Sequence, residues 1–307
     1  MSSYRFCRTD DVSLLVDALN RCRSPHFPGE PAMTPSTFKR SIRDLQVWCS
    51  SCMVAFAGSD PIGVLIGAKR PSSTLIHKIA VHPDHCRQGH GRHLLTSLSS
   101  KLAILGPPRM VAEVPANLAA ACALFNSSGY VQEALLTDYV LDQTDGRKSP
   151  GLYTIPVTVD DLGANGLLEN AHPQLCWERA VETLNARKDD IAGLAVASDE
   201  RIEACLLYVE RPPGFARGSQ RELRRDLAGA LAEAGSVHEA EILSLRSFVE
   251  DGGARLAHLL SEVRARGMRT FWFPKVHPAE VSQALLETLG FRAAGAHLVY
   301  GARARSA

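Results

Sequence analysis

One segment constrains the fold of this chain more than any other: an apolar run leads through a glycine-rich turn into an apolar-periodic stretch. It reads Ile79-Ala-Val-His-Pro-Asp-His-Cys-Arg-Gln-Gly-His-Gly-Arg-His-Leu-Leu95, and it predicts a strand, a tight turn and a helix. Gly89 and Gly91 carry no Cβ atom, so an anion can approach the backbone N–H groups that begin the helix. The helix dipole, Arg87 and Arg92 add positive charge there, and the turn is therefore expected to bind a phosphate.

Two other phosphate-binding turns fit this segment less well. A dinucleotide-binding turn typically has the pattern GxGxxG, but Leu94 stands at its third glycine position. A Walker-type loop requires Gly-Lys-Ser/Thr, which the segment lacks. The order Val81-x-Pro83, a polar stretch and Gly89-x-Gly91 instead resembles the signature of the GNAT N-acyltransferases, in which this turn holds the pyrophosphate of acetyl-coenzyme A (acetyl-CoA).

A second motif follows at a spacing that is typical of the same family. The chain continues with a strand-like run, Met110-Val-Ala-Glu-Val114, then Asn117, a helix-like stretch through Phe125 and the pair Gly129-Tyr130. This order is similar to the closing pattern of the GNAT family, which is strand, Asn, helix, aromatic residue and Gly-aromatic pair. Two linked motifs are more specific than one, so the sequence is identified as a member of this family.

The chain has 307 residues, enough for two domains, and its two halves resemble each other. A strand-turn-strand pattern at residues 53–66 recurs at residues 193–206, and the pattern at 109–130 recurs at 270–291. We therefore expect an α/β (α+β) fold of two tandem GNAT-like domains, each a mixed, mostly antiparallel sheet flanked by helices. The predicted boundaries are a first domain at residues 1–142, a polar linker at 143–151 and a second domain at 152–307.

The second copy differs from the first at the glycine turn. Where the first has Cys86-Arg-Gln-Gly-His-Gly-Arg92, the second has Phe248-Val-Glu-Asp-Gly-Gly-Ala-Arg255. This difference places the carboxylates of Glu250 and Asp251 in or beside the turn, where they would repel a pyrophosphate. The second domain is therefore expected to be degenerate as a coenzyme site.

Composition excludes several classes of function. A formal net charge of +1 is too small for a broad nucleic-acid-binding surface. No apolar stretch is long enough to cross a membrane, and the N-terminal residues lack the apolar core of a signal peptide. We therefore expect a cytoplasmic protein with neither a nucleic acid nor a membrane as partner. The eight cysteines are scattered, which favours reduced thiols over a disulfide framework.

Two groups of residues suggest a metal site and are better explained otherwise. Cys49 and Cys52 have CxxC spacing but no second pair of cysteines follows them. Five possible zinc ligands surround the glycine turn, namely His82, His85, Cys86, His90 and His93. Ligands spread across a tight turn and opposite faces of a helix do not converge easily, so no metal is predicted.

The resemblance implies which residues hold acetyl-CoA, the expected cosubstrate. Val81 is expected to make backbone contacts with the pantetheine arm, and Asn117 and Phe125 to line the other side of that arm. The turn is expected to hold the pyrophosphate through Arg87, Gln88, Gly89, His90, Gly91 and Arg92. Cys86 stands where many family members have Arg or Gln, a loss for which the two residues after it can compensate.

Acyl transfer from a thioester to an amine needs a group that accepts the amine proton and donors that stabilise the oxyanion. His77 lies on the strand before the turn, and because imidazoles titrate near neutral pH it is the first candidate base. Glu113 on the next strand is the second candidate, and either can act through water. Phe125 has no hydroxyl, whereas many family members have a tyrosine there that protonates the coenzyme thiolate.

The predicted function is transfer of an acetyl group from acetyl-CoA to a primary amine of an unidentified acceptor. The acceptor is expected to be an amine-bearing small molecule, a protein N-terminus or a lysine, and a homodimer is left open. The alternative is a non-catalytic acyl-CoA-binding sensor or scaffold. The absence of a tyrosine hydroxyl at Phe125 and the degenerate second copy favour that alternative.

Overall fold

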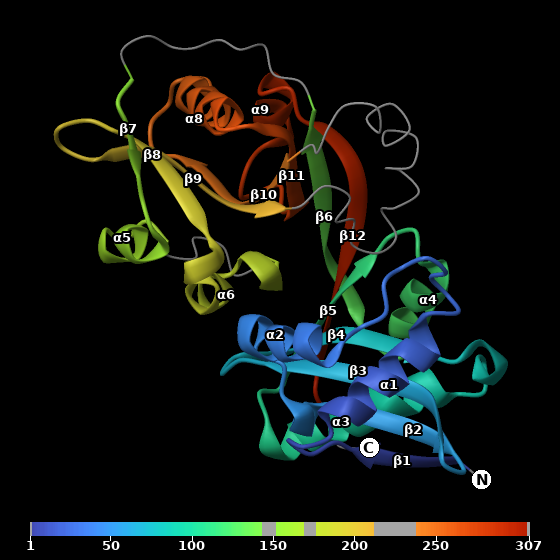
Figure 1. The fold of residues 1–307 in the computed structure, drawn as a ribbon. Coiled ribbons are helices and arrows are strands. Elements are labelled where there is room, and N and C mark those ends of the chain that lie inside the picture. The colour runs from blue at the N-terminus through green and yellow to red at the C-terminus, as the bar shows by residue number, and fades with distance from the viewer. Residues whose placement is uncertain (1, 143–151, 169–175, 212–237, 306–307) are drawn as a thin grey trace. The chain divides into compact units, whose positions relative to one another are not determined.

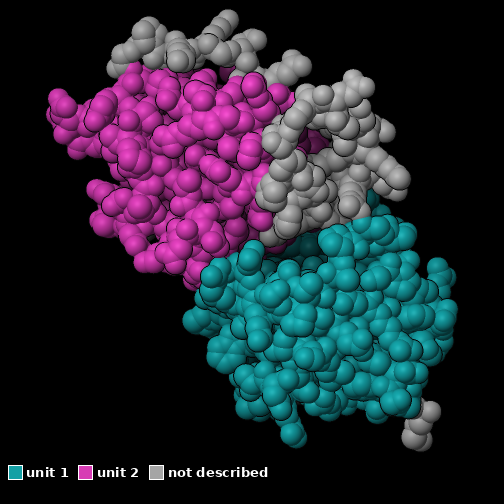
Figure 2. Space-filling model, viewed as in Figure 1, with its two compact units in different colours: residues 1–134, 298–307 teal, residues 135–297 magenta. Residues whose placement is uncertain are grey.

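The computed structural model describes residues 2–142, 152–168, 176–211 and 238–305. The chain forms two compact units, one of residues 1–134 with 298–307 and one of residues 135–297 (Figure 2). The predicted linker at 143–151 lies outside the described residues.

Unit 1 begins with a strand and contains helices on both faces of its sheet (Figure 1). Its elements in chain order are β1 (Ser2–Phe6), α1 (Val12–Arg23), α2 (Pro35–Leu45), the short 3₁₀ turn η1 (Cys49–Ser51), β2 (Met53–Ala57), β3 (Asp60–Lys69), β4 (Ser73–Val81), the 3₁₀ turn η2 (Pro83–His85), α3 (His90–Leu105), β5 (Arg109–Pro115), α4 (Ala119–Ser127) and the start of β6 (Val131–Leu141). The longest helix, α3, has 16 residues. Within the described part of the chain, no helix combines the length and apolar character needed to span a bilayer.

The sheet of unit 1 runs β1-β2-β3-β4-β5 and continues into the end of the last strand, β12 (Arg292–Arg303). Its first four strands pair antiparallel, and β4 pairs parallel with β5. A core on one face is formed by the apolar side of α3, by α4 and by the inward side chains of the strands. This core includes Leu94, Leu98 and Leu102, whose four-residue spacing makes one face of α3 apolar.

Strand β4 contains a β-bulge near its centre. Its pairing with β3 shifts register between Ile76 and Lys78, so His77 is an extra residue with no partner on β3. Ile76 lies in the core on the α3 side, and Ile79 packs against that core. The bulge therefore places two consecutive side chains, His77 and Lys78, on the opposite face, where Lys78 lies beside residues of α1.

Unit 2 repeats this arrangement with shorter helices. Its described elements are the end of β6, β7 (Thr154–Pro156), α5 (Val159–Ala164), the 3₁₀ turn η3 (Trp177–Arg179), α6 (Val181–Ala186), the 3₁₀ turn η4 (Lys188–Asp190), β8 (Ala192–Ala197), β9 (Ile202–Arg211), β10 (His238–Ser247), α8 (Ala254–Ala265), β11 (Met268–Val276), α9 (Gln283–Thr288) and the start of β12. The sheet order is β6-β11-β10-β9-β8-β7, with β10 and β11 parallel and the other pairs antiparallel. One core lies against α8 and α9 and another against α5 and α6. The predicted fold of two tandem, mostly antiparallel mixed sheets flanked by helices is confirmed.

The two units exchange their last strands. Residues 135–141 of β6 belong to unit 2, where Tyr139 and Leu141 enter the core, whereas residues 298–303 of β12 belong to unit 1, where Tyr300 enters the core. The compact units therefore differ from the contiguous ranges expected from the sequence. Strand-forming segments of similar pattern end both copies, and the sequence alone does not say which sheet each one joins.

Candidate active site

Strands β4 and β5 separate beside the bulge. They pair over three residues, from Ser73↔Arg109 to Leu75↔Val111, and no further pairing joins these two fully described strands. His77 and Glu113 each lie two residues beyond the last pair and therefore stand at the same level on either side of the opening. The neighbours of Glu113 on β5, Ala112 and Val114, lie in the core, so Glu113 faces the same side of the sheet as His77.

Backbone groups of β4 also face this opening. The N–H of His82 donates to the Ile62 carbonyl at 2.9 Å, so position 82 bonds to β3. In an antiparallel ladder, only every second residue directs its backbone N–H and C=O groups toward a given neighbouring strand. Ile79 and Val81 alternate with the residues that bond to β3, and they therefore direct their N–H and C=O groups away from β3. The Val81 carbonyl accepts a hydrogen bond from the imidazole of His26 at 2.8 Å. The N–H groups at 79 and 81 are donors available to a molecule in the opening.

The predicted glycine turn leads directly from this opening into α3. Gly89 is the N-cap residue with a left-handed backbone (φ +87°), and no side chain caps the helix N-terminus. Arg87 also has a left-handed backbone (φ 60°), an arrangement that costs a non-glycine residue roughly 1–3 kcal/mol and is commonest at ligand sites. Arg87 and Arg92 are exposed, and neither has an ion-pair partner among the described residues. The helix N-terminus and two uncompensated cations thus form one positive site.

Gly91 serves packing as well as access. A Cβ atom there would lie 3.1 Å from the Leu124 side chain of α4, so the glycine lets α3 and α4 approach closely. At Gly89 an added Cβ would meet nothing within 4 Å, which leaves that side of the turn open. The sequence suggested access to the backbone at both glycines, and the structure shows open space at Gly89 and helix packing at Gly91.

Two predicted coenzyme residues direct their side chains elsewhere. His90 is buried against β1, where its Nδ1 atom lies 2.6 Å from the Tyr4 hydroxyl. Burial, followed by the neighbouring His85 and His93, lowers the pKa of His90 and so favours the neutral ring. The Gln88 amide donates to the Asp84 carbonyl at 3.1 Å. His90 can therefore contribute its backbone N–H to an anion, but not a side-chain charge.

The two predicted residues after β5 have different surroundings. Asn117 is exposed in the turn between β5 and α4. The ring of Phe125 is buried and stacks on Tyr300 of β12, with centroids 5.6 Å apart, and meets Tyr130 edge-on at 5.1 Å. Phe125 is therefore a core residue of unit 1, and Tyr300 is a neighbour that the sequence did not reveal. Asn117 alone of this pair is accessible to a bound molecule.

In the described residues, no group of three or more His, Cys, Asp and Glu side chains is placed to hold a metal ion. The rings of His82, His85 and His90 instead follow one another edge to face, with centroids 6.1 and 6.2 Å apart. Cys49 and Cys52 are buried free thiols, and burial raises the pKa of Cys52 far above its ordinary value. A thiol in that state is inert.

Unit 2 has the same bulge and the same opening but different residues in them. Its parallel pairing ends at Glu241↔Trp272, and the register of β10 against β9 shifts between Ile242 and Ser244. Counting two residues beyond the last pair, as in unit 1, places Leu243 where unit 1 has His77 and Pro274 where it has Glu113. Neither residue can accept a proton. The second unit therefore lacks both candidate bases, a correspondence that only the strand registers reveal.

The anion site of unit 2 is filled by the protein itself. The Asp251 carboxylate accepts hydrogen bonds from the Gly253 N–H at 3.0 Å and the Arg255 N–H at 2.9 Å at the start of α8. It also pairs with the Arg255 guanidinium, which bonds Glu203 as well. The sequence indicated repulsion of a pyrophosphate by Glu250 and Asp251, and the structure adds that Asp251 occupies the amides that a phosphate would use. Glu250 is exposed.

Removing this carboxylate should destabilise unit 2. Burial alone would raise the pKa of Asp251, but hydrogen bonds from Arg255 and Gly253 outweigh it and hold the pKa below its ordinary value. The stabilisation is therefore present at neutral pH and is lost as pH falls below about 4. We expect Asp251→Ala to lower the free energy of unfolding by about 1 kcal/mol at pH 7, and Asp251→Asn, which keeps a cap, by less. Urea titration at pH 7 and pH 3 measures the free energy of unfolding of each variant. If Asp251→Ala lost equal stability at the two pH values, the ionised carboxylate would not be the source of the stabilisation.

Known proteins resemble this chain in sequence and in fold. The model of the acetyltransferase (GNAT) family matches residues 15–130. The [ribosomal protein bS18]-alanine N-acetyltransferase of Escherichia coli strain K12 is 37% identical over 84 residues, which make up 27% of this chain and 56% of that protein. The chain thus spans little more than half the length of this curated relative.

Solved structures match over the whole chain. A GCN5-related N-acetyltransferase from Sphaerobacter thermophilus superposes with a TM-score of 0.62 at 14% identity, covering 99% of this chain and 96% of that one. A tandem GNAT protein from the clavulanic acid biosynthesis pathway gives 0.61 at 15% identity and covers 100% of both chains. At these identities the likeness shows the fold alone. Residues 15–130, which fall in unit 1, thus match the acetyltransferase (GNAT) family, and the whole chain has the fold of a tandem GNAT protein.

Proposed function

We propose that unit 1 binds acetyl-CoA and transfers its acetyl group to a primary amine. The observation that carries this proposal is the uncapped N-terminus of α3, with Arg87 and Arg92 beside it, at the end of a strand that has separated from its neighbour. The helix N-terminus suits a pyrophosphate. The N–H groups of Ile79 and Val81, which point away from β3, suit an amide-containing arm lying along β4, with Asn117 on its other side. Phe125 supports this side from within the core.

The chemistry that we assign to these residues is proton acceptance and oxyanion stabilisation. His77 accepts the proton of the acceptor amine, directly or through water, because the bulge turns its side chain to the face opposite the core. The backbone N–H groups at 79 and 81 are donors for the oxyanion. Glu113 faces the same side and is the second candidate base. Phe125 and Tyr300 are buried, so the thiolate leaves without a proton from either.

The acceptor is proposed at the level of a primary amine. The curated relative is named for acetylating an alanine of a ribosomal protein, which favours a protein N-terminus over a lysine or an unrelated small amine. A binding-only sensor is the second candidate, because the buried Phe125 offers no hydroxyl. It predicts binding of acetyl-CoA without transfer to any amine.

A calorimetric titration with acetyl-CoA tests the binding site. We expect one site per chain and a dissociation constant ten to a hundredfold weaker in Arg92→Glu, since hydrogen bonds to a charged group contribute about 1.5–3 kcal/mol. Arg92 is preferable to Gly91 as the target because it is exposed, whereas a side chain at 91 would press on Leu124. Arg201→Glu, at an exposed position in unit 2, is the control with the same change in net charge. Two sites, or equal loss in both variants, would contradict the assignment.

Thiol labelling gives a second readout of the same site. Cys86 is exposed in the turn, whereas six of the other cysteines are buried and Cys122 is half-buried. Burial raises the pKa of Cys22 and of Cys205 to about 11, so neither reacts at pH 7. N-ethylmaleimide should therefore label Cys86 first, and acetyl-CoA should slow that labelling. Mass spectrometry of the labelled peptides measures the effect; unchanged labelling at saturating acetyl-CoA would place the coenzyme elsewhere.

A further inference from the structure

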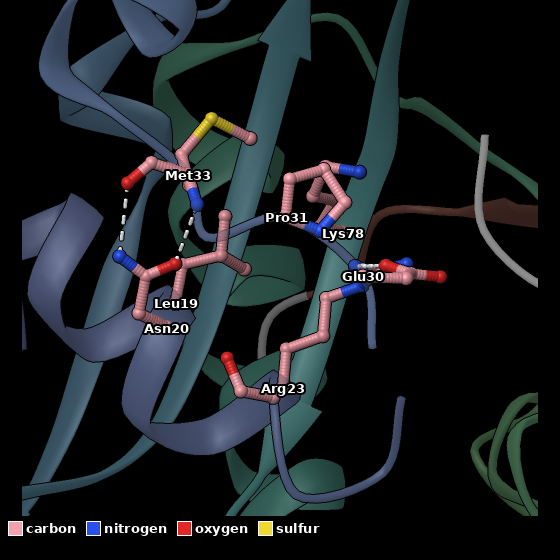
Figure 3. Close-up of a pocket in the computed structure, with 8 residues that line it drawn as sticks. Leu19, Asn20, Arg23, Glu30, Pro31, Met33 and Lys78 are labelled. Carbon is pink, nitrogen blue, oxygen red and sulfur yellow. Dashed lines mark hydrogen bonds and ion pairs between the residues drawn. The ribbon is translucent and has the colours of Figure 1, made fainter. Parts of the chain in front are cut away.

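A small pocket lies on the face of β4 that carries His77 and Lys78. It has a cavity volume of about 30 Å³ and lies between α1, the segment that joins α1 to α2, and β4 (Figure 3). Its walls are formed by Leu19, Asn20, Arg23, Ser24, Glu30, Pro31, Met33 and Lys78. Lys78 directly follows His77, and consecutive strand residues are about 3.3 Å apart. The pocket therefore begins one residue away from the candidate base.

The segment that closes this pocket is fixed at three points. The Asn20 side chain bonds both the N–H and the carbonyl of Met33, at 2.7 and 2.9 Å, as Figure 3 shows. Arg23 forms an ion pair with Glu30. His26 bonds the Val81 carbonyl at the end of β4. The pocket is thus built into the free protein, and its side chains are held in place before any molecule enters.

One polar atom of the pocket is left without a partner. Arg23 bonds the Oε2 atom of Glu30, but the Oε1 atom is buried and accepts no hydrogen bond from any described residue. A buried carboxylate oxygen in this state is costly, because it has lost its water without gaining a donor. Arg23 already compensates the negative charge of Glu30. The free Oε1 atom is therefore better matched by a neutral hydrogen-bond donor than by a second cation.

We propose that Glu30 Oε1 accepts the N–H of an amide next to the acceptor amine, so that the acceptor is an α-amino amide, as at a peptide N-terminus. This inference rests on the proposed function. In such a molecule the amine and the next amide N–H are one residue apart. This separation matches the one-residue distance along β4 between His77 and Lys78, which lines the pocket. The apolar walls at Leu19, Pro31 and Met33 suit a small side chain. Glu30 is then a specificity-determining residue for unit 1.

The test compares two acceptors that differ in one atom group. Alanine N-methylamide has an amide N–H where alanine methyl ester has an oxygen. Coenzyme A is titrated first, and the two compounds are then titrated into the coenzyme A complex, which has no acetyl group to transfer. We expect the amide to bind at least about tenfold more tightly, because a site built for an N–H rejects the analogue that lacks it. In Glu30→Met, which keeps the length without an acceptor oxygen, the two affinities should agree within about twofold.

Asn20→Ala is the matched control, because it loosens the same segment without touching Glu30. It should weaken both compounds and preserve their ratio. A titration with trialanine amide distinguishes a peptide from a small acceptor. Tighter binding than that of alanine N-methylamide favours a peptide, whereas equal binding favours a small α-amino amide. If the wild-type protein did not bind coenzyme A, both the proposed function and this inference would be overturned.

Three results would overturn this inference alone while coenzyme A still binds. The first is equal binding of amide and ester to the wild type. The second is a preference for the amide that persists in Glu30→Met. The third is a stronger preference for 1,4-diaminobutane over 1-aminobutane than for amide over ester, which would mean that Glu30 Oε1 selects a cation.

Discussion

Replacing Tyr300 by alanine should lower the free energy of unfolding of unit 1 by about 3–5 kcal/mol, the usual cost of removing a buried aromatic ring. Tyr300 lies 175 residues after Phe125 in sequence, yet its ring stacks on Phe125 in the core of unit 1. A domain typically has only 5–15 kcal/mol of stability. Deleting residues 298–307, which also removes the strand beside β5, should therefore unfold unit 1 and abolish coenzyme binding, although the deleted segment is far from the glycine turn.

Hydrogen exchange followed by mass spectrometry can assign this loss to one unit. Peptides from α3, β5 and α4 should lose protection in Tyr300→Ala, whereas peptides from β8, β9 and α8 in unit 2 should keep it. Tyr300→Phe is the control, because it retains the ring and removes only the hydroxyl, whose pKa is raised by burial and by contact with Cys122. If unit 1 retained its protection without residues 298–307, the exchange of strands would not contribute to its stability.

The local features of the candidate site were predictable from the sequence. The Gly89-x-Gly91 turn, the helix after it and the exposed arginines depend on residues close together in the chain. The burial of His90 could also have been predicted from the sequence. His90, Leu94, Leu98 and Leu102 follow one another at four-residue spacing, which indicates that the histidine lies on the buried face of α3.

Other features depend on contacts that no local pattern records. The bulge at His77 follows from the register between β3 and β4, and the correspondence with Leu243 requires a second register in unit 2. The stacking of Tyr300 on Phe125 requires knowing which sheet the last strand joins. The free oxygen of Glu30 becomes apparent only once Arg23 is seen to bond the other one. Pairing and burial across long sequence separations decide all of these.

The two units together provide an internal comparison for the mechanism. Both have a bulged strand, a neighbouring strand that separates from it and a glycine turn before a helix. They differ in the candidate catalytic side chains and in the helix N-terminus: His77 against Leu243, Glu113 against Pro274, and an uncapped α3 against an α8 capped by Asp251. Because the backbone is shared and these candidate groups are not, the residues that distinguish unit 1 are the ones to substitute.

His77→Ala should lower kcat about 10²- to 10⁴-fold, the range typical of losing a general base, while the dissociation constant of acetyl-CoA stays unchanged. The side chain lies on the face of β4 opposite the α3 core, so its removal should affect proton transfer and not coenzyme binding. Glu113→Gln should lose less activity than His77→Ala. A larger loss of kcat in Glu113→Gln than in His77→Ala would transfer the role of base to Glu113.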